Sequence, residues 1–504
     1  MSLAIVHTRA RLGIDAPTVT VEVHLSNGLP GLSIVGLPET AVKESKDRVR
    51  SALINSQFDF PARRITINLA PADLPKDGGR FDLAIAIGIL AASEQIPDNV
   101  LNDFEFIGEL ALSGELRAIH GILPAAIACG KSKRKLILPC KNTIEASLCE
   151  TTQMYSAESL LAVCAHLQQK NILKKISFKK TESTLSTPDF SDVYGQKHVK
   201  RALEIAAAGG HNVLLYGPPG TGKTMLASRL PSIMPPLEQS QAIDVASIHS
   251  LCGHHYPHWQ LPPFRNPHHT ASAVALVGGG SHPQPGEISL AHHGVLFLDE
   301  LPEFQRHVLE VLREPLESGE IRISRATAQL IFPAQFQLVA AMNPCPCGYL
   351  SSPTQHHRKQ RCTCTQEQIQ RYRQKISGPL LDRIDLHIPV TSIPIDELHP
   401  TKNKKNTSEC SANIRQRVIE ARKKQQQRQQ TINAKLSTRQ LASYCNLGEE
   451  EKALLNHAME KLALSGRAYH RIIKVARTIA DLENAKEIRS HHIAESLSLR
   501  NFDR

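Results

Sequence analysis

The chain has 504 residues, 41% of them apolar and 21% charged, which is enough for about three packed domains. Its longest apolar run, residues 83–92, is half the ~20 residues that a spanning helix needs, so we expect no membrane segment and a cytoplasmic location. Lys and Arg exceed Asp and Glu by 59 to 48, and the formal charge of +11 favours a polyanionic partner, nucleic acid before an acidic membrane face.

The pattern of elements changes along the chain and predicts three folded regions. Residues 1–168 mix short strand-like runs with helical stretches, which is typical of an α+β domain. A polar, lysine-rich stretch at 169–190 is typical of a linker. Strands and helices alternate over 191–395, which predicts a parallel α/β domain. A basic helical connector (396–430) and an all-α region (431–504) follow.

Residues 217–224, GPPGTGKT, form a complete G-x-x-x-x-G-K-[ST] loop between the strand-like NVLLY and a helix-like segment. Such a loop wraps its backbone N–H groups around phosphate oxygens. Lys223 can reach the β- and γ-phosphates, and Thr224 can ligate Mg²⁺. The flanking pattern disfavours a mere glycine-rich turn. The predicted ATP-binding residues are Gly217, Pro218, Pro219, Gly220, Thr221, Gly222, Lys223 and Thr224.

Two further strand-like runs end in polar residues that suit phosphate chemistry. GVLFLDE ends in Asp299, which can hold Mg²⁺ through water, and Glu300, which can orient and deprotonate the attacking water. FQLVAAMN ends in Asn343, whose amide could sense the γ-phosphate, although such an amide alone is more often a turn residue.

These motifs together resemble those of AAA+ ATPases. The segment LLDRIDL (380–386) looks like the one that presents an arginine finger to a neighbouring subunit, which makes Arg383 the candidate. The alternative is that Arg383 pairs with a nearby aspartate. SGRAYHRIIKVARTIADL (465–482) resembles the second sensor of a helical lid, with Arg467 in the matching position.

Segments 265–300 and 302–348 resemble the magnesium-chelatase-like branch of AAA+ proteins, and within it the ComM/YifB family, over essentially the whole chain. The resemblance implies a homo-oligomeric, hexameric ring that acts on single-stranded and branched DNA. It also implies an ATP-driven helicase that promotes branch migration during natural transformation.

Residues 75–92 and 108–123 resemble the proteolytic domain of Lon, in which a serine and a lysine form a catalytic dyad. Here Arg80 stands in the serine position and Leu123 in the lysine position. Arginine cannot act as the nucleophile and leucine cannot act as the base, so we expect no peptidase activity. The domain could instead assemble a ring, offer a DNA-binding face, or serve only for packing.

Four of the eleven cysteines form two Cys-x-Cys pairs in an insertion at 343–364, namely Cys345 with Cys347 and Cys362 with Cys364. In a reducing compartment four clustered thiolates predict a structural zinc site. A redox pair and four unliganded thiols are the alternatives, and His356 or His357 could replace one cysteine.

Candidate DNA contacts are loops that could line a channel and bind phosphates without regard to sequence. The segment 320–333 alternates like a hairpin, with Arg322 and Arg325 near its tip, and 274–290 is a second inserted loop. A solvated hairpin with ordinary arginines is the alternative, and the basic stretch 401–430 is a further candidate. The paired histidines, His268–His269 among them, have no assigned role.

The sequence therefore predicts an ATP-dependent DNA translocase. A chelatase-type metal-insertion subunit and a protein-remodelling ATPase or protease remain alternatives. A scaffold that only binds ATP is a further alternative, against which the intact Asp299–Glu300 pair argues.

Overall fold

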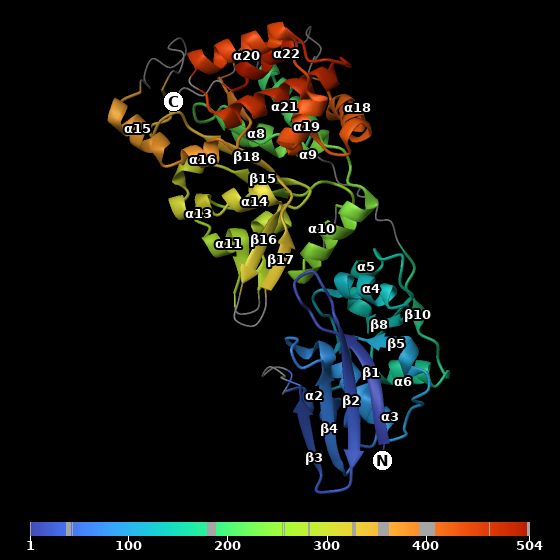
Figure 1. Cartoon of the computed structure of the whole chain (residues 1–504). Coiled ribbons are helices and arrows are strands. Elements are labelled where there is room, and N and C mark those ends of the chain that lie inside the picture. Colours follow the sequence, from blue (N-terminus) through green and yellow to red (C-terminus); the bar gives the residue numbers. More distant parts are fainter. Residues whose placement is uncertain are drawn as a thin grey trace, which may run out of the picture.

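The computed structural model describes residues 2–36, 42, 44–178, 188–254, 256, 258–280, 283–324, 329–350, 362–392, 409–462 and 464–500. These residues form three regions that follow one another in space as they do along the chain (Figure 1). Blue and cyan elements lie at one end, a green-to-yellow core lies in the middle, and orange-to-red helices lie at the other end. No helix among the described residues is long and apolar enough to cross a membrane.

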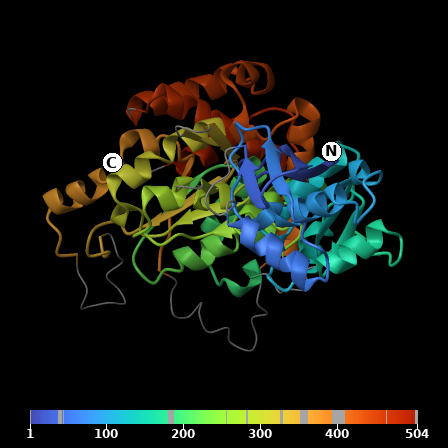
Figure 2. The ribbon, with the colours of Figure 1, turned by 90° about the horizontal axis from the view of Figure 1, so that it is seen from below.

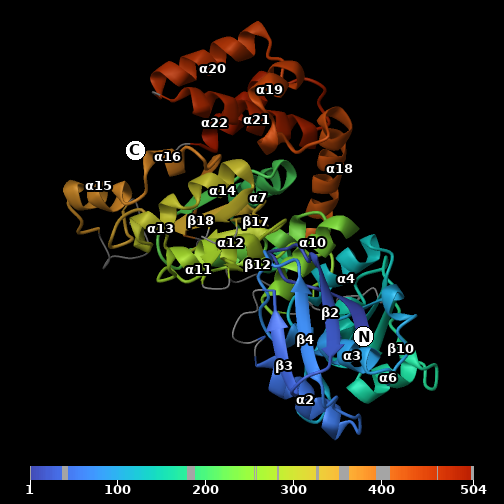
Figure 3. The same ribbon diagram turned by 60° about the horizontal axis from the view of Figure 1, so that its bottom comes forward.

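The N-terminal region is built on an eight-stranded mixed sheet with the order β10-β9-β8-β5-β1-β2-β4-β3. Its strands are β1 (Ser2–Arg9), β2 (Thr18–Ser26), β3 (Gly31–Val35), β4 (Arg64–Ala70), β5 (Phe104–Phe106), β8 (Lys135–Pro139), β9 (Met154–Ala157) and β10 (Lys174–Lys175), with a small separate hairpin of β6 (Glu109–Leu110) and β7 (Leu116–Arg117). Its helices are α2 (Ser45–Asn55), α3 (Asp82–Ala92), α4 (Ile122–Lys131), α5 (Thr143–Ala146) and α6 (Leu160–Leu167). The neighbours β1, β2 and β4 are antiparallel. Figure 3 shows β2, β4 and β3 side by side.

Helix α3 accounts for the longest apolar run of the sequence. All eleven of its residues are buried. A helix that is apolar on every side has to be covered on every side, and α3 packs across β1 and β2. Its backbone approaches β2 so closely that a methyl group built on Gly88 would lie 2.6 Å from Cγ2 of Val23. The run is therefore a core helix.

The core is a five-stranded sheet with the order β12-β15-β18-β11-β19, in which every neighbouring pair is parallel. Its strands are β11 (Val213–Tyr216), β12 (Phe264–Arg265), β15 (Val295–Leu298), β18 (Gln337–Met342) and β19 (Leu386–Pro389). Its helices are α7 (Lys197–Gly209), α8 (Lys223–Ser228), α9 (Leu230–Ile233), α10 (Gln239–Leu251), α11 (Ala273–Val277), α12 (Glu287–Leu290), α13 (Arg306–Glu310), α14 (Arg313–Ser318), α15 (Gln366–Gln374) and α16 (Gly378–Leu381). Parallel strands collect their carboxyl ends at one edge, which is where ligands bind in such sheets.

Alternate residues of the core strands face two different apolar clusters. Val213 and Leu215 of β11 face α7 and the C-terminal helices, whereas Leu214 faces the opposite side. That opposite side holds the hairpin of β16 (Glu320–Ser324) and β17 (Gln329–Pro333), and a smaller hairpin joins β13 (Gly278–Gly279) to β14 (Gln284–Pro285). The parallel α/β domain and the hairpin predicted at 320–333 are thus both confirmed by the structure.

An apolar cluster joins the N-terminal region to the core. Leu123 and Ala126 of α4 share this cluster with Val245 of α10 and with Trp259, the single tryptophan of the chain. A backbone hydrogen bond of 2.9 Å from Gly121 to the Ser250 carbonyl lies beside it. Seen from below in Figure 2, the N-terminal region covers one side of the core, and the orange helix α15 lies toward the other side.

The C-terminal region consists of helices wherever the structure describes it between residues 409 and 500. These are α18 (Ser411–Gln429), α19 (Thr438–Tyr444), α20 (Glu449–Lys461), α21 (Gly466–Leu482) and α22 (Ser490–Ser498). Apolar residues of α18 and α21, such as Val418 and Ile479, pack into the same cluster as α7. The helical region is therefore continuous with the core.

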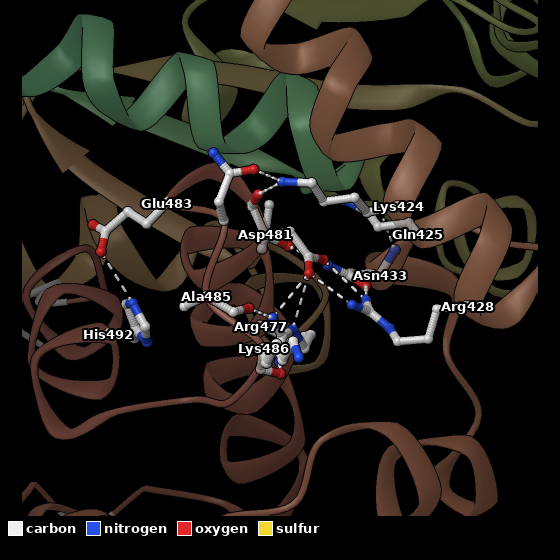
Figure 4. Close-up of polar contacts among 12 residues, drawn as sticks. Lys424, Gln425, Arg428, Asn433, Arg477, Asp481, Glu483, Ala485, Lys486 and His492 are labelled. Carbon is white, nitrogen blue, oxygen red and sulfur yellow. Dashed lines mark hydrogen bonds and ion pairs between the residues drawn. The ribbon is translucent and has the colours of Figure 1, made fainter.

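A buried carboxylate, Asp481 of α21, ties α18 to α21 (Figure 4). Arg428 of α18 donates two hydrogen bonds to it, at 2.7 and 2.9 Å. Asn433 Nδ2 and Arg477 Nε add donors at 2.9 and 3.1 Å, and Lys424 donates to the Asp481 carbonyl at 3.1 Å. A buried charge that is fully paired is tolerated, whereas loss of one partner is costly.

Parts of the linker predicted over 169–190 belong to the packed regions. Strand β10 pairs with β9, Ile176 joins the cluster between the N-terminal region and the core, and Phe190 is fully buried in the core. Residues 179–187 lie outside the described residues, as do 393–408 at the start of the basic connector.

Candidate nucleotide site and metal centre

The glycine-rich loop lies where the sequence predicts it, between the carboxyl end of β11 and the first residue of α8. Gly222 has a φ of 84°, a conformation that L side chains rarely adopt, and it turns the chain directly into the helix. The loop therefore joins the strand to the N-terminus of α8, which is the strand–loop–helix order of phosphate-binding loops.

Lys223 is the first residue of α8, and its ammonium group lies inside the loop. Its Nζ donates to the carbonyls of Gly217 and Pro218 at 2.8 and 2.9 Å and to Oδ1 of Asn343 at 3.1 Å. Asn343 directly follows β18, the strand next to β11. Burial lowers the pKa of Lys223. A phosphate would offer this ammonium a charged acceptor, which binds more strongly than neutral carbonyls.

Thr224 and Asp299 provide oxygen atoms that fit a magnesium ion. Thr224 Oγ1 donates a 2.6 Å hydrogen bond to Oδ2 of Asp299, so the two candidate ligands are adjacent. Asp299 follows β15, whose four residues are all buried. Mg²⁺ prefers hard oxygen donors and usually binds through one or two protein groups together with substrate phosphates. The donor set therefore suits Mg²⁺ bound with a nucleotide.

Glu300 contacts a histidine that the sequence analysis left without a role. Glu300 has a φ of 51°, and its backbone N–H donates to Oδ1 of Asp299 at 2.9 Å. Its Oε2 lies 3.3 Å from Nδ1 of His269, which comes from the loop after β12. The contact arises because β12 and β15 are neighbours in the sheet. The ring of His269 in turn lies 4.1 Å from that of His268.

Arg383 lies at the opposite edge of the sheet from the glycine-rich loop. It precedes β19, whereas the loop follows β11, and these parallel strands pair Leu386 with Val213. A four-residue strand separates the two edges by about 13 Å. The structure therefore does not bring Arg383 to the phosphate loop of its own chain.

The Arg383 side chain is buried and is paired within the same chain. It is 6% exposed, and its Nη2 donates to Oε1 of Glu317 at 2.5 Å while Nη1 donates to the Pro379 carbonyl at 2.7 Å. The partner is thus Glu317, and not the neighbouring aspartates considered from the sequence. Burial lowers the pKa of Arg383; the Glu317 charge opposes this effect, and the charges of other arginines, Arg467 among them, add to it.

Arg467 is exposed at the start of α21, close enough to Arg383 for the two charges to repel. One turn further along, Arg471 donates to the Arg383 carbonyl at 3.1 Å and to the carboxylate of Asp385. Asn212 donates to the same carbonyl at 3.0 Å. The backbone of Arg383 is therefore clamped between the sheet and the helix that carries Arg467.

The four cysteines predicted to bind metal converge. Cys345 and Cys347 have sulfur atoms 3.4 Å apart, and those of Cys347 and Cys362 are 3.5 Å apart. All four ligand atoms, including that of Cys364, lie within 4.8 Å of one another. Sulfurs around a tetrahedral zinc, with Zn–S bonds of ~2.3 Å, would be separated by roughly 3.8 Å. All four are free thiols, so the cluster fits a zinc ion. Residues 351–361, with His356 and His357, lie outside the described residues.

The predicted DNA contacts are only partly described. Arg322 lies on β16 with 57% of its side chain exposed, and its nearest ion-pair partner is Glu320 at 3.7 Å. Arg325 lies outside the described residues. The apolar face of the hairpin packs against the N-terminal region, where Leu12 joins the cluster that contains Phe332.

The basic stretch 401–430 does not form a free cationic face on the part that the structure describes. Arg417 pairs with Glu204 at 2.5 Å, and Arg422 donates to the Ala207 carbonyl at 2.7 Å. Burial lowers the pKa of Arg422 to about 10. Lys424 and Arg428 bond to Asp481. These side chains attach α18 to its neighbours, so the charge run is largely structural on α18.

Arg80 and Leu123, which the sequence resemblance matches to the Lon dyad, are both buried. Arg80 is 5% exposed two residues before α3, and burial lowers its pKa to about 10. Leu123 is fully buried in the cluster between the N-terminal region and the core. Neither can supply the nucleophile or the base of a peptidase.

Comparison with known proteins identifies related chains over the full length. Models of magnesium chelatase subunit ChlI match residues 189–398 and 21–142, and a model of its C-terminal part matches 408–500. The chain is 54% identical to the competence protein ComM of Haemophilus influenzae over 99% of its length and 98% of that protein. It is 51% identical to YifB of Escherichia coli over 100% of its length and 98% of that protein. The magnesium-chelatase 38 kDa subunit of Rhodobacter capsulatus is 27% identical, over 31% of this chain and 50% of that one.

Proposed function

The chain belongs to the ComM/YifB family of magnesium-chelatase-like AAA+ proteins, and on this basis we propose that it is an ATPase that drives branch migration of DNA during natural transformation. The substrate is a single-stranded or branched DNA, and the working form is a ring of identical subunits, as the family resemblance implies. The location is the cytoplasm, where the clustered thiols stay reduced.

In the proposed reaction the carboxyl edge of the core sheet binds Mg–ATP. The loop 217–224 and Lys223 hold the phosphates, and Thr224 with Asp299 would hold Mg²⁺, which neutralises charge on the β- and γ-phosphates when bound. Glu300 orients and deprotonates the attacking water. Asn343, which bonds to Lys223, contacts the γ-phosphate.

The single observation that carries the proposal is the distance between the two edges of the sheet. Arg383 precedes β19 at the amino edge, and its carbonyl is bonded by Arg471, one turn after Arg467 on α21, while the phosphate loop lies at the carboxyl edge. An arginine that stabilises the transferring phosphoryl group must touch it. Both arginines would therefore serve the nucleotide of a neighbouring subunit, and the neighbour's phosphate would compete with Glu317 for Arg383.

A ring that contains such shared sites has heterologous interfaces and a central channel. We place the hairpin β16–β17 at the channel, where Arg322 and Arg325 would contact phosphates of the DNA backbone. Contacts of this kind are independent of sequence and weaken with salt. The formal charge of +11 suits a polyanionic substrate.

A structural zinc ion is part of the proposal. The four sulfurs of Cys345, Cys347, Cys362 and Cys364 would fill the tetrahedron and leave no open position for catalysis. Metal analysis of freshly purified protein should find about one zinc per chain. Protein that is folded and contains no zinc would contradict this assignment.

The test of function compares native protein with a Lys223→Ala variant. The assays are ATP turnover with and without forked DNA, and unwinding of a branched duplex. Lys452→Ala, which removes a half-exposed lysine paired with Glu449 on α20, is the matched control. We expect native protein and the control to unwind the branch and the Lys223 variant to fail. Equal unwinding by all three, or none by native protein, would contradict the proposal.

Two rival functions give different results in the same assay. A chelatase-type subunit would hydrolyse ATP faster with its partner subunits than with DNA, and a protein-remodelling ATPase would respond to unfolded protein. The chain is 54% identical to ComM over 99% of its length, against 27% to the chelatase subunit over 31%, and this contrast favours the DNA substrate. A peptidase lacks support because Arg80 and Leu123 carry neither a nucleophile nor a base.

A further inference from the structure

The four-cysteine loop (residues 343–364) begins at Asn343, which is itself a residue of the candidate nucleotide site. Strand β18 ends at Met342, Asn343 follows it and accepts a hydrogen bond from Lys223, and Cys345 comes two residues later. Cys345 is fully buried. The first candidate metal ligand is therefore linked by two peptide bonds to a side chain that contacts the phosphate-binding lysine.

The loop also touches the glycine-rich loop directly. The backbone N–H of Gly348 donates to the Cys345 carbonyl at 3.0 Å and closes a turn at the cluster. Gly348 has a φ of 85° and lies against the ring of Pro219. A methyl group built on Gly348 would lie 2.8 Å from Cδ and 3.2 Å from Cγ of Pro219, which leaves no room for a side chain.

The far end of the cysteine loop leads back into the core. Helix α15 begins one residue after the Thr365 cap, which itself follows Cys364. This helix carries Tyr372, which is 6% exposed in an apolar cluster of the core. A methyl group built on Gly348 would also lie 3.9 Å from Cγ of Asn343, so the loop packs against Asn343 as well as Pro219.

We propose that the cysteine loop is a positioning element of the nucleotide site, in which Gly348 packs against Pro219 and Asn343, and metal binding by the four cysteines is coupled to nucleotide binding. The proposal rests on the function proposed above. A metal ion would fix the spacing of the two Cys-x-Cys pairs and hence the position of Gly348 against Pro219 and Asn343. Because coupling free energies are reciprocal, a bound nucleotide must then tighten the metal site by the same factor.

The experiment measures the equilibrium affinity of the full-length protein for Zn²⁺ by competition with a chromogenic chelator, with and without AMP-PNP at constant Mg²⁺. We expect AMP-PNP to tighten Zn²⁺ binding at least ~5-fold, the lower end of typical coupling factors. The affinity of metal-stripped and Zn²⁺-loaded protein for a fluorescent ATP analogue should differ by the same factor. These affinities do not depend on turnover.

Two variants show whether the contacts carry the coupling. Gly348→Ala introduces the clash with Pro219, so the coupling factor should fall towards one while Zn²⁺ still binds. Gly78→Ala is the matched control, because Gly78 has a φ of 71° and a methyl group there would meet nothing within 4 Å.

The outcomes separate this inference from the function on which it rests. Zn²⁺ affinity that is the same with and without AMP-PNP, in protein that binds the fluorescent analogue, would overturn the coupling and leave the ATP site intact. Protein that binds no nucleotide would overturn both. A Gly348→Ala variant that keeps the native coupling factor would overturn the assigned contact.

Discussion

Replacement of Asp385 by asparagine should disable hydrolysis while nucleotide binding stays intact. Asp385 is 4% exposed at the amino edge of the sheet. It accepts hydrogen bonds from Arg471 and from the backbone N–H of Asn212, the latter at 3.0 Å. The charge of Arg471 and the His211 hydrogen bond hold the pKa of Asp385 well below its usual range, against the opposing effect of burial.

The expected loss of folding stability follows from the burial of the Asp385–Arg471 ion pair. Loss of one partner of a buried ion pair costs about 3–5 kcal/mol. The Arg471 side chain is 24% exposed and can turn to water, so we expect the lower end, about 3 kcal/mol. Because the folded pKa is depressed, this stability is present above the unfolded pKa of about 3.9 and is lost as pH falls below it.

The functional effect arises because Arg471 also holds the Arg383 carbonyl. A misplacement of about 1 Å in a catalytic group can cost about 100-fold in rate. The assay is ATP turnover in assembled protein, beside the affinity for a fluorescent ATP analogue. Asp98→Asn, an exposed aspartate of the N-terminal region, is the control. A native turnover rate in Asp385→Asn, or an equal loss of nucleotide affinity, would refute the proposed clamp on Arg383.

Three further changes test other parts of the structure. His269→Ala should release Glu300 from its 3.3 Å contact, raising ATP turnover without DNA and lowering the stimulation by DNA. Arg322→Ala should weaken DNA binding equally for all sequences. It should also reduce, by about one, the slope of the logarithm of the DNA-binding constant against the logarithm of salt concentration (the salt slope). Leu123→Ala should cost about 2–5 kcal/mol where the N-terminal region meets the core. The loss of stability is measured by the fluorescence of Trp259, which lies in the same cluster as Leu123. The fluorescence change on unfolding should occur at a lower denaturant concentration in the variant.

The controls are side chains outside these contacts. His307→Ala, exposed on α13, should leave the stimulation by DNA unchanged. Lys452→Ala removes one positive charge far from the hairpin and should leave the salt slope unchanged. Unaltered DNA stimulation in the His269 variant would contradict the restraint on Glu300, and an unaltered salt slope in Arg322→Ala would remove that residue from the DNA contact.

The carboxyl edge of the core could be predicted from sequence because its signals are local. The G-x-x-x-x-G-K-[ST] loop located Lys223. An apolar strand followed by a polar residue places that residue at a known edge of a parallel sheet, and this rule located Asp299 and Asn343. The cysteine cluster was equally local, since two Cys-x-Cys pairs can converge through a single turn. In each case the predicted geometry depends on few degrees of freedom.

The contacts that the sequence did not reveal depend on the order of strands. His269 reaches Glu300 only because β12 lies beside β15, and no spacing in the sequence encodes that neighbour. The burial of Arg383 by Glu317, and the contact of Gly348 with Pro219, likewise join segments far apart in the chain. The basic stretch that includes α18 was a candidate DNA contact because a sequence does not show internal partners such as Glu204.

A mixing experiment tests most directly whether each ATP site is shared between two neighbours. Lys223→Ala lacks the phosphate lysine and Arg383→Ala lacks the arginine, so each variant alone should be inactive. In rings assembled from equal amounts, about one quarter of the interfaces would combine an intact Lys223 with an intact Arg383 from the next subunit. ATP turnover that recovers towards that fraction is the predicted result. Mixed rings whose ATP turnover is as low as that of either variant alone would contradict a site built from two subunits.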